Sequence, residues 1–283
     1  MLNFNNLQKP YLIAEIGINH NGDLQIAKRL VDAAFACSWD CVKFQKKNPD
    51  KSVPKQQKKI PKETPWGIMT YLEYKHKMEL SKESYDHIDA YCRMKPIDWS
   101  VSVWDLDSLE FIKQYEVPFI KIPSALLTND QLITRAAKTK IPIILSTGMS
   151  TIGEIDRAVR LLERHASQFV LMHCNSSYPA KLSELNLRLI PKLKERYGCT
   201  VGYSGHEFGL DSTTVAVALG AMVVERHITL DHMMWGTDHS SSIEPQGMDK
   251  LYKQVHSVRY ILGDGEKRVY DSELPIRKKL RGC

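Results

Sequence analysis

The sequence lacks the patterns that would place it in a membrane, in a disulfide-bonded secreted scaffold or on nucleic acid. No apolar run is long enough to span a bilayer, and the opening residues, MLNFNNLQKPYL, have no charged segment followed by an apolar stretch, so no signal peptide is evident. The six cysteines form no CxxC pair, which favours free thiols in a reducing cytoplasm. No basic stripe interleaved with aromatic residues and no zinc-finger spacing occurs, which argues against a nucleic-acid partner.

What remains is the composition of an ordinary globular protein. The 283 residues are 43% apolar and 25% charged, enough for a substantial core in two small domains or one large α/β barrel. The formal net charge is +6, with lysine-rich patches around residues 46–63 and 277–281. These patches are either solvated surface, which is the simpler interpretation, or a positive field that attracts a phosphorylated or acidic small molecule.

Apolar segments with strand character alternate with amphipathic segments along the chain. The expected strands span residues 11–18, 41–45, 99–104, 118–123, 141–147, 169–174, 200–204 and 221–227. The expected helices lie near residues 23–37, 81–94, 105–115, 128–138, 151–166, 183–196, 209–219 and 247–262. Because apolar strands that alternate with helices form parallel sheets, these units predict a single (β/α)8 TIM barrel domain over residues 1–283. A doubly wound open sheet is the competing arrangement.

One segment breaks this alternation. Residues 46–80 carry several prolines and lysines before the next helix, and we expect a long loop there, lying over the C-terminal face as a lid or a partner surface. The segment STGMST at residues 146–151 reads either as a loop that contacts phosphate or substrate, or as a plain helix start. Residues suited to cap helices precede several of the expected helices: Asp23, Asp105, Thr128, Thr151 and Ser183.

Polar side chains stand at the carboxyl ends of nearly all the expected strands, where barrel enzymes carry their catalytic groups. Lys43 and Lys121 interrupt apolar strands, and a buried charge is costly unless it is paired or binds a ligand. Three interpretations stay open: ion pairs with Glu15 or Glu225, a clamp for phosphate or carboxylate, or a Schiff-base lysine. The clamp is favoured because two lysines fit an anion better than they fit one nucleophile. Serines at other strand ends supply neutral donors: Ser102, Ser124, Ser146 and Ser204.

His206 and His227 follow two consecutive late strands, beside Glu225. Each histidine alone is explained as a buried rim residue. Together with the carboxylate they predict a divalent metal site with open positions, and the absence of cysteine at zinc spacing argues against a structural zinc site. Imidazole, carboxylate and water would accept manganese, cobalt, zinc or magnesium. Spacing alone leaves both interpretations of the histidines open.

Eight motifs then occur in order between residues 14 and 245: AEIGINHNGD, VKFQ, IKIPS, ILSTGMST, HCNSSYP, GYSGH, VERHITLD and GTDHSSSIEP. Together they resemble the sialic acid (N-acetylneuraminate) synthase family over essentially the whole barrel. The resemblance implies an enzyme that condenses phosphoenolpyruvate with an open-chain N-acylated amino sugar, typically N-acetylmannosamine, and releases phosphate. It also implies a divalent cation, usually manganese or magnesium.

At the matching positions the resemblance implies a role for each polar residue of the rim. His206 and His227 would bind the metal, and Glu15 and Glu225 would handle protons or orient the attacking water. Phosphoenolpyruvate would be held by two lysines and five serines: Lys43, Lys121, Ser102, Ser124, Ser146, Ser176 and Ser204. Ser102 stands where the family commonly has threonine, and Ser176 where some members have asparagine.

The acceptor side is less well defined. The resemblance implies that Tyr178 and Asp238 contact the sugar, but Leu126 stands where the family usually has an acidic residue. The family also continues into an antifreeze-like domain whose arginine reaches the partner's site in a homodimer, whereas this sequence ends at Cys283, so a separate antifreeze-like protein is a further candidate partner. Two other functions stay open: a metal-dependent lyase or isomerase acting on another phosphorylated compound, and a non-catalytic phosphate-binding protein that acts through partners.

Overall fold

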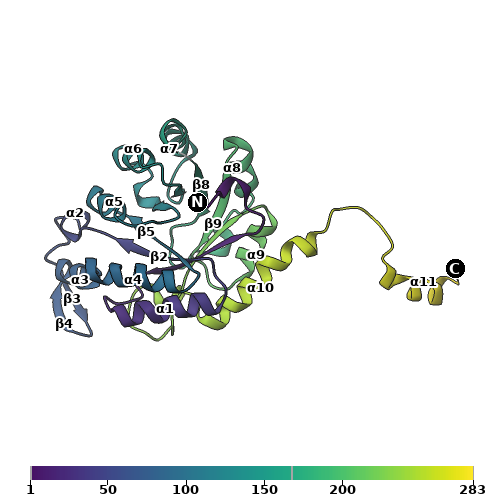
Figure 1. Cartoon of the computed structure of the whole chain (residues 1–283), viewed down its shortest axis with the longest axis horizontal. Coiled ribbons are helices and arrows are strands. Elements are labelled where there is room, and N and C mark those ends of the chain that lie inside the picture. Colours follow the sequence, from purple (N-terminus) through teal and green to yellow (C-terminus); the bar gives the residue numbers. More distant parts are fainter. Residues whose placement is uncertain (1, 167, 283) are drawn as a thin grey trace.

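The chain folds around a closed barrel of parallel strands. The structure is a computed structural model that describes residues 2–166 and 168–282. Going round the barrel, the strands follow the order β1-β10-β9-β8-β7-β6-β5-β2 (Figure 1). Their bounds are β1 (Tyr11–Gly17), β2 (Cys41–Lys46), β5 (Asp98–Val103), β6 (Ile120–Ile122), β7 (Ile143–Ser146), β8 (Phe169–Cys174), β9 (Thr200–Gly205) and β10 (Val223–His227). The closure confirms the predicted barrel over the doubly wound open sheet.

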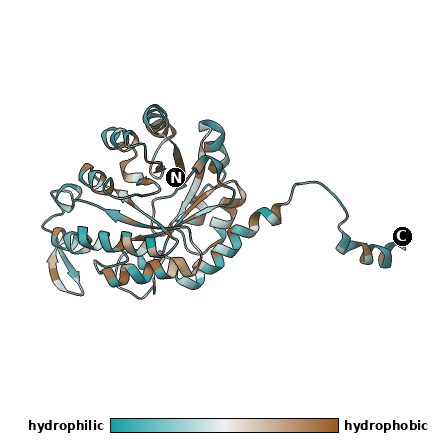
Figure 2. Ribbon diagram, in the orientation of Figure 1, coloured by the Kyte–Doolittle hydropathy of each residue, from teal (hydrophilic) through white to brown (hydrophobic). Residues whose placement is uncertain are grey.

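Helices follow the strands and form the outer layer. They are α1 (Leu24–Ala36), α4 (Lys82–Met94), α5 (Leu106–Ile112), α6 (Asp130–Lys138), α7 (Ile152–His165), α8 (Leu189–Tyr197), α9 (Asp211–Ala218) and α10 (Pro245–Leu262). Short 3-10 turns precede three of them, namely η2 (Ser124–Leu126), η3 (Leu182–Glu184) and η4 (His239–Ser241), and a further turn, η1 (Phe4–Asn6), precedes β1. Figure 2 shows both hydrophilic and hydrophobic residues along these helices, as expected for a layer with one buried and one solvated face.

Three of the five expected helix caps are confirmed. The side chains of Asp23, Asp105 and Thr151 each accept a hydrogen bond from a backbone N–H in the first turn of the following helix. Two expectations were wrong. Asn129 rather than Thr128 caps α6, and Ser183 lies in η3 because α8 begins only at Leu189. Asn186 explains the later start: its φ of +45° cannot continue a right-handed helix.

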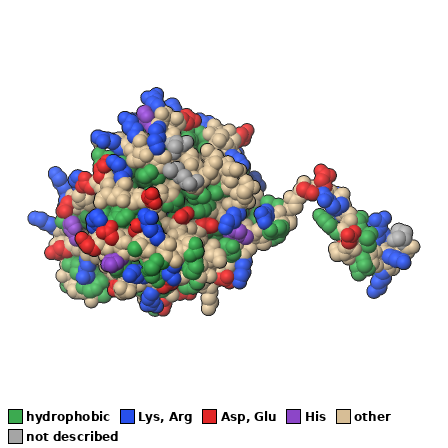
Figure 3. All heavy atoms as spheres, in the orientation of Figure 1, with side chains coloured by type: hydrophobic (Ala, Val, Ile, Leu, Met, Phe, Trp, Pro, Cys, Tyr) green, Lys and Arg blue, Asp and Glu red, His purple; other side chains and the backbone are tan. Residues whose placement is uncertain are grey.

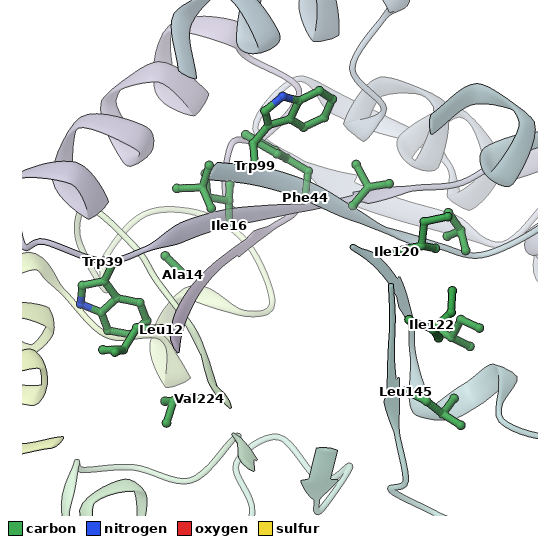
Figure 4. Close-up of a cluster of buried hydrophobic side chains, with 14 of the residues drawn as sticks. Leu12, Ala14, Ile16, Trp39, Phe44, Trp99, Ile120, Ile122, Leu145 and Val224 are labelled. Carbon is green, nitrogen blue, oxygen red and sulfur yellow. The ribbon is translucent and has the colours of Figure 1, made fainter. Parts of the chain in front are cut away.

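Side chains along each strand alternate between the barrel interior and the helical layer. On β1, Leu12, Ala14 and Ile16 point outward into the main apolar cluster, which also contains residues from β2, β5, β6, β7 and β10 (Figure 4). Tyr11 and Ile13 have the opposite parity and belong to a second cluster, which also has members on β2, β7, β8 and β10. This second cluster therefore fills the barrel interior.

The amino-terminal end of the barrel is closed by an aromatic plug. Phe4, from η1, packs edge-on against Tyr11 and Phe119, with ring centroids 5.7 Å and 5.9 Å away. All three rings are buried. The interior is thus apolar and filled at this end, so polar groups on the same strands can gather only towards the carboxyl-terminal end.

The segment expected as a long loop, residues 46–80, contains regular structure. It holds the short helix α2 (Pro49–Ser52), an antiparallel hairpin of β3 (Pro61–Thr64) and β4 (Gly67–Thr70), and α3 (Tyr71–Met78). A reciprocal capping box between Thr70 and Glu73 starts α3. The segment after β2 is therefore a small folded insertion with helices and a hairpin, rather than an unstructured loop.

The last segment of the described chain lies outside the barrel. Beyond Leu262 the chain leaves the barrel, passes through η5 (Asp271–Glu273) and continues into α11 (Leu274–Arg281), which lies apart from the body (Figure 1).

Figure 3 shows basic and acidic side chains interspersed on the viewed face, as expected for solvated surface. None of the helices in residues 2–166 and 168–282 combines the length and apolar character that a bilayer crossing requires. The five cysteines within those ranges are free thiols, and Cys283 lies outside them.

Candidate active site

Strand register brings the charged residues of the rim together. Glu15 on β1 lies beside Lys43 on β2 and beside His227 on β10, and Glu225 on β10 lies beside Ser204 on β9. These residues share the inward parity of Tyr11 and Ile13, one layer closer to the carboxyl-terminal end. Their strands come from the first and last parts of the sequence, so the barrel closure itself assembles the cluster.

The charged side chains form a buried network. Lys43 Nζ lies 2.5 Å from Glu15 Oε2 and 3.7 Å from Glu225 Oε2, and Lys121 Nζ lies 3.0 Å from Glu225 Oε1. All four residues are at most 4% exposed. The ion pairs that the sequence left open as one interpretation are therefore present. They do not test the anion clamp or the Schiff base, which stay predictions.

The two carboxyl groups of the network have pKa values shifted in opposite directions. Burial raises the pKa of Glu15, and the neighbouring Lys43 only partly opposes this effect. Burial also acts to raise the pKa of Glu225, but the ammonium groups of Lys121 and Lys43 outweigh it and lower that pKa to about 2. For Lys43, burial acts to lower the pKa, but Glu15 and Glu225 outweigh it and raise the value. Glu225 therefore stays ionised, whereas Glu15 is the carboxyl group that takes up a proton more readily.

The serines surround this network with hydroxyl groups. Ser204 Oγ donates a hydrogen bond to Glu225 Oε1 at 3.2 Å. Ser102, beside Lys121 in the strand register, donates to the Phe44 carbonyl oxygen at 3.4 Å. Ser146 Oγ is buried and has no hydrogen-bond partner among the described residues. A buried hydroxyl without a partner is uncommon, and it is available to a ligand.

A second group of polar atoms lies where β6, β7 and β8 end. The Gly148 backbone N–H donates to Ser124 Oγ at 3.0 Å, and Ser124 Oγ lies 3.2 Å from Cys174 Sγ. A Cβ atom on Gly148 would stand 2.3 Å from Ser176 Oγ and 2.9 Å from Ser124 Oγ. Only glycine therefore lets these hydroxyl groups approach the backbone, and the result is a compact concave group of hydrogen-bonding atoms.

The two predicted metal ligands lie next to each other. The ring centroids of His206 and His227 are 5.8 Å apart. Burial, followed by the proximity of His227, lowers the pKa of His206 to about 4, and burial also lowers the pKa of His227. Both imidazoles are therefore neutral near pH 7, which is the form that binds a metal.

The donor set fits a metal that keeps open coordination positions. His227 Nδ1 is buried and has no hydrogen-bond partner among the described residues. Within the same residues, no three side chains of His, Cys, Asp or Glu converge as a closed set of ligands. Two neutral imidazoles would leave the remaining positions to substrate and water, as in a catalytic rather than a structural site.

The two residues predicted to contact the sugar, Tyr178 and Asp238, lie near the histidines. The Tyr178 hydroxyl is 2.8 Å from His206 Nε2. Asp238 is the residue immediately before η4, and its charge acts on His227. Leu126, in η2, packs against the main apolar cluster and so takes part in the core. The position that is usually acidic in the resembling family is therefore an apolar packing position here.

The structure adds residues that were not assigned a role from the sequence. Gln45 Nε2 donates to Glu15 Oε1 at 3.2 Å, and its position two residues after Lys43 on the same strand face could have indicated this contact. For Gly148 and Cys174, the sequence offered only their place in the motifs STGMST and HCNSSYP as an indication of a role. Lys47 lies 3.8 Å above the Trp104 ring, and burial together with the neighbouring Lys75 lowers its pKa to about 8.

Cavity volume alone would have pointed elsewhere. A cavity of about 650 Å³ opens at the amino-terminal end of the barrel, where Phe4, Lys194 and Tyr197 line part of it. It contains none of the residues of the charged network. The convergent charges, unpartnered polar atoms and shifted pKa values at the opposite end make that end the candidate active site.

Comparisons with known proteins identify relatives of the chain. Residues 30–267 match the model of the NeuB family. The chain is 36% identical to the N,N'-diacetyllegionaminic acid synthase of Campylobacter jejuni, covering 94% of this chain and 81% of that protein. It is also 36% identical to the N-acetylneuraminate-9-phosphate synthase of Drosophila melanogaster, with 95% and 80% covered. Among solved structures, the sialic acid synthetase of Leptospira borgpetersenii superposes with a TM-score of 0.85 at 31% identity, covering 98% of this chain and 93% of that one.

The matched range includes Lys43, Lys121, Glu225 and both imidazoles. By its sequence and its fold, this chain belongs to the NeuB family.

Proposed function

We propose that the protein condenses phosphoenolpyruvate with an open-chain N-acylated amino sugar, such as N-acetylmannosamine, to form a nonulosonic acid and free phosphate. The observation that carries the proposal is the buried Lys43–Glu15–Glu225–Lys121 network at the strand ends, beside two neutral imidazoles. The similar legionaminic acid and N-acetylneuraminate-9-phosphate synthases support the same reaction class.

The charge balance of the network suits an anionic substrate. Glu15 has a raised pKa, so it can be neutral while Lys43 and Glu225 stay charged. Two ammonium groups then face one carboxylate, and the excess positive charge would stabilise the carboxylate or phosphate of phosphoenolpyruvate in a buried site. This is the physical basis for assigning Lys43 and Lys121 to the clamp.

Hydroxyl groups would complete the binding of phosphoenolpyruvate. The unpartnered Ser146 Oγ and the neighbouring Ser102 and Ser204 supply donors around the two lysines. Ser124 and Ser176 supply two more beside Gly148. Neutral donors that are already in place need no reorganisation when charge shifts from the enol phosphate during the reaction.

Glu15 is the proposed proton-transfer group. Its two oxygens are fixed by Lys43 at 2.5 Å and by Gln45 at 3.2 Å, and its raised pKa makes it a better proton acceptor than an ordinary carboxylate. In the proposed reaction, C3 of phosphoenolpyruvate attacks the aldehyde carbon, and water then adds at C2 before phosphate leaves. Glu15 would take the proton of that water, and the ionised Glu225 would keep both lysines in position.

We further propose that His206 and His227 hold a divalent manganese or magnesium ion. The unpartnered His227 Nδ1 and the neutral state of both rings support this assignment. When bound, the ion would supply Lewis-acid polarisation of the aldehyde oxygen of the acceptor. Tyr178 and Asp238 would hold the sugar beside it.

The active form is proposed to be a homodimer in a reducing cytoplasm. Five free thiols support the compartment, and the exposed apolar side chains Tyr260, Ile261 and Leu262 at the end of α10 support a contact between subunits. A separate antifreeze-like protein remains a further proposed partner. Light scattering of the purified chain, alone and with such a protein, would test both assemblies.

The deciding experiment measures phosphate release from phosphoenolpyruvate across a panel of N-acylated amino sugars with manganese. We expect release that requires both substrates, with a nine-carbon keto acid detected by mass spectrometry when the acceptor is N-acetylmannosamine. Lys121→Met serves as the inactive control. Turnover of a phosphorylated compound without any aldose would indicate a lyase or isomerase instead. Binding of phosphoenolpyruvate without turnover on any sugar would indicate a non-catalytic protein.

A further inference from the structure

Tyr178 covers one of the two proposed metal ligands. It lies in the loop after β8, and its ring stacks on His206, which follows β9, with centroids 4.1 Å apart and planes inclined by 30°. The Tyr178 hydroxyl is 2.8 Å from His206 Nε2, whereas Ser204 Oγ is 3.5 Å from the same nitrogen. The phenol is therefore the main hydrogen-bond partner of this nitrogen.

The other ring nitrogen fixes the direction of this hydrogen bond. His206 Nδ1 lies 2.6 Å from the backbone carbonyl oxygen of Asn175. A carbonyl oxygen can only accept, so Nδ1 carries the proton and donates it. In a neutral imidazole the lone pair then resides on Nε2, and the Tyr178 hydroxyl must be the donor to it. The nitrogen that could bind a metal is thus the nitrogen that the hydroxyl occupies.

The two imidazoles differ in this respect. His227 Nδ1 has no hydrogen-bond partner among the described residues, and the His227 ring meets Tyr178 only edge-on at 5.7 Å. Tyr178 itself is 52% exposed, so its side chain can turn towards solvent without leaving a cavity in the core. Of the two proposed metal ligands, His227 has an unpartnered nitrogen, whereas His206 is covered by the exposed side chain of Tyr178.

We propose that Tyr178 is a removable cap on His206, whose hydroxyl occupies Nε2 in the metal-free protein and is released when a divalent cation binds there. The inference rests on the proposed metal site. Its consequence is coupling: the released hydroxyl becomes available to hydrogen-bond the acceptor sugar, so metal binding strengthens sugar binding and the sugar strengthens metal binding by the same factor. Tyr178 acts here as a positioning residue, through His206 and the acceptor.

Titration of Mn²⁺ into the substrate-free protein tests the cap. Tyr178→Phe keeps the stacked ring and removes only the hydroxyl, so the ion no longer competes with a hydrogen bond. We expect the variant to bind Mn²⁺ about three- to tenfold more tightly than the wild type by calorimetry, the net worth of one hydrogen bond. Tyr91→Phe is the matched control, because its hydroxyl donates to Asp32 elsewhere on the protein and its loss should leave Mn²⁺ affinity unchanged.

A second titration measures the coupling. The affinity of the wild type for N-acetylmannosamine should rise when Mn²⁺ is present, and this rise should be smaller in Tyr178→Phe, which keeps only the direct contact between ion and sugar. Equal or weaker Mn²⁺ binding by the Phe variant would overturn the cap while leaving the metal site intact. A wild-type protein that binds no Mn²⁺ at all would overturn both the cap and the metal part of the proposed function. Phosphate release from phosphoenolpyruvate tests the proposed reaction separately.

Discussion

Two buried ionic networks lie back to back on β10, and they differ in how completely their polar atoms are used. Glu225 points into the barrel and Arg226, the next residue, points out towards the helices, and both are at most 4% exposed. The inner network contains Lys43, Lys121 and Glu15, and the outer one contains Glu207. Similar amounts of charge are therefore buried on the two sides of one strand.

The outer network is saturated. Arg226 donates to Glu207 Oε1 at 3.0 Å, to Thr213 Oγ1 at 2.7 Å and to the Glu207 carbonyl oxygen at 2.6 Å. Glu207 also accepts from Tyr203 at 2.8 Å and from Ser212. Such a network stabilises the attachment of α9 to the barrel and offers nothing to a ligand.

The inner network is not saturated. Ser146 Oγ and His227 Nδ1 beside it have no hydrogen-bond partners among residues 2–166 and 168–282. Unused donors and acceptors in a buried site lower stability unless a ligand uses them, so they indicate binding rather than packing. The degree of saturation thus distinguishes the two networks where burial and charge alone do not, and it supports the proposed function of the inner one.

The largest effect is expected on the outer network. Arg226→Met should lower the free energy of unfolding by about 3–5 kcal/mol, because it leaves the fully buried Glu207 carboxylate without its cation. Urea denaturation would measure the change. In the control Arg196→Met, a half-exposed ion pair with Asp156 is removed, and the loss should stay below about 1 kcal/mol. Equal losses in the two variants would break the comparison.

The inner network should respond in activity rather than stability. Lys121→Met should reduce kcat/KM for phosphoenolpyruvate by about 10²–10³-fold, since it removes one preorganised charge from the site. Its effect on the free energy of unfolding should be smaller than that of Arg226→Met, because Glu225 keeps Lys43 at 3.7 Å. Lys77→Met, on the exposed side of α3, is the control for loss of a lysine. A Lys121→Met protein with normal kinetics and low stability would reverse the assignment.

A pair of hydroxyl deletions sharpens the contrast. Thr213→Val removes an acceptor used by Arg226 and should lower the free energy of unfolding by about 2 kcal/mol. Ser146→Ala removes a hydroxyl with no partner and should leave stability nearly unchanged, while raising KM for phosphoenolpyruvate. Thermal unfolding and steady-state kinetics on both variants would decide. A stability loss at Ser146 as large as that at Thr213 would show that the inner hydroxyl is structural.

The smallest effect concerns a saturated buried histidine outside both networks. Burial lowers the pKa of His20 to about 4, and its Nδ1 accepts a hydrogen bond from the Gly22 N–H at 3.0 Å. The unfolded chain takes up a proton below pH of about 6.5, whereas the folded protein does so only near pH 4, so stability falls as pH drops through this window. His20→Asn should reduce that decline by up to about 1.4 kcal/mol between pH 7 and pH 5.5, as measured by urea denaturation. Parallel pH profiles for the two proteins would contradict this account.

The strand pattern was predictable because it is a local property. Alternation with a period of two residues places Lys43 and Glu15 on inward positions whatever lies elsewhere in the chain. Strand ends were less predictable where proline intervenes. The strand expected over 118–123 is only Ile120–Ile122, since Pro118 and Pro123 have no N–H to contribute to the ladder.

Which lysine pairs with which glutamate could not be predicted from local periodicity. Either lysine could have paired with either glutamate from the sequence alone, and the ladder registers around the closed barrel decide that Lys43 meets Glu15 and Lys121 meets Glu225. The same holds for the two networks on β10. Parity predicts that Glu225 and Arg226 face opposite sides, but only the packing of α9 reveals that one network is saturated and the other is not.

The sequence by itself determined the eight alternating units, the inward position of the charged residues and the family to which the chain belongs, because these follow from short-range periodicity and from ordered motifs. The tertiary structure alone decided which charges pair, which hydroxyl groups stay unused and that Tyr178 covers His206. These features depend on atoms that are far apart in the chain and only a few ångströms apart in space. No local pattern of residues encodes such distances.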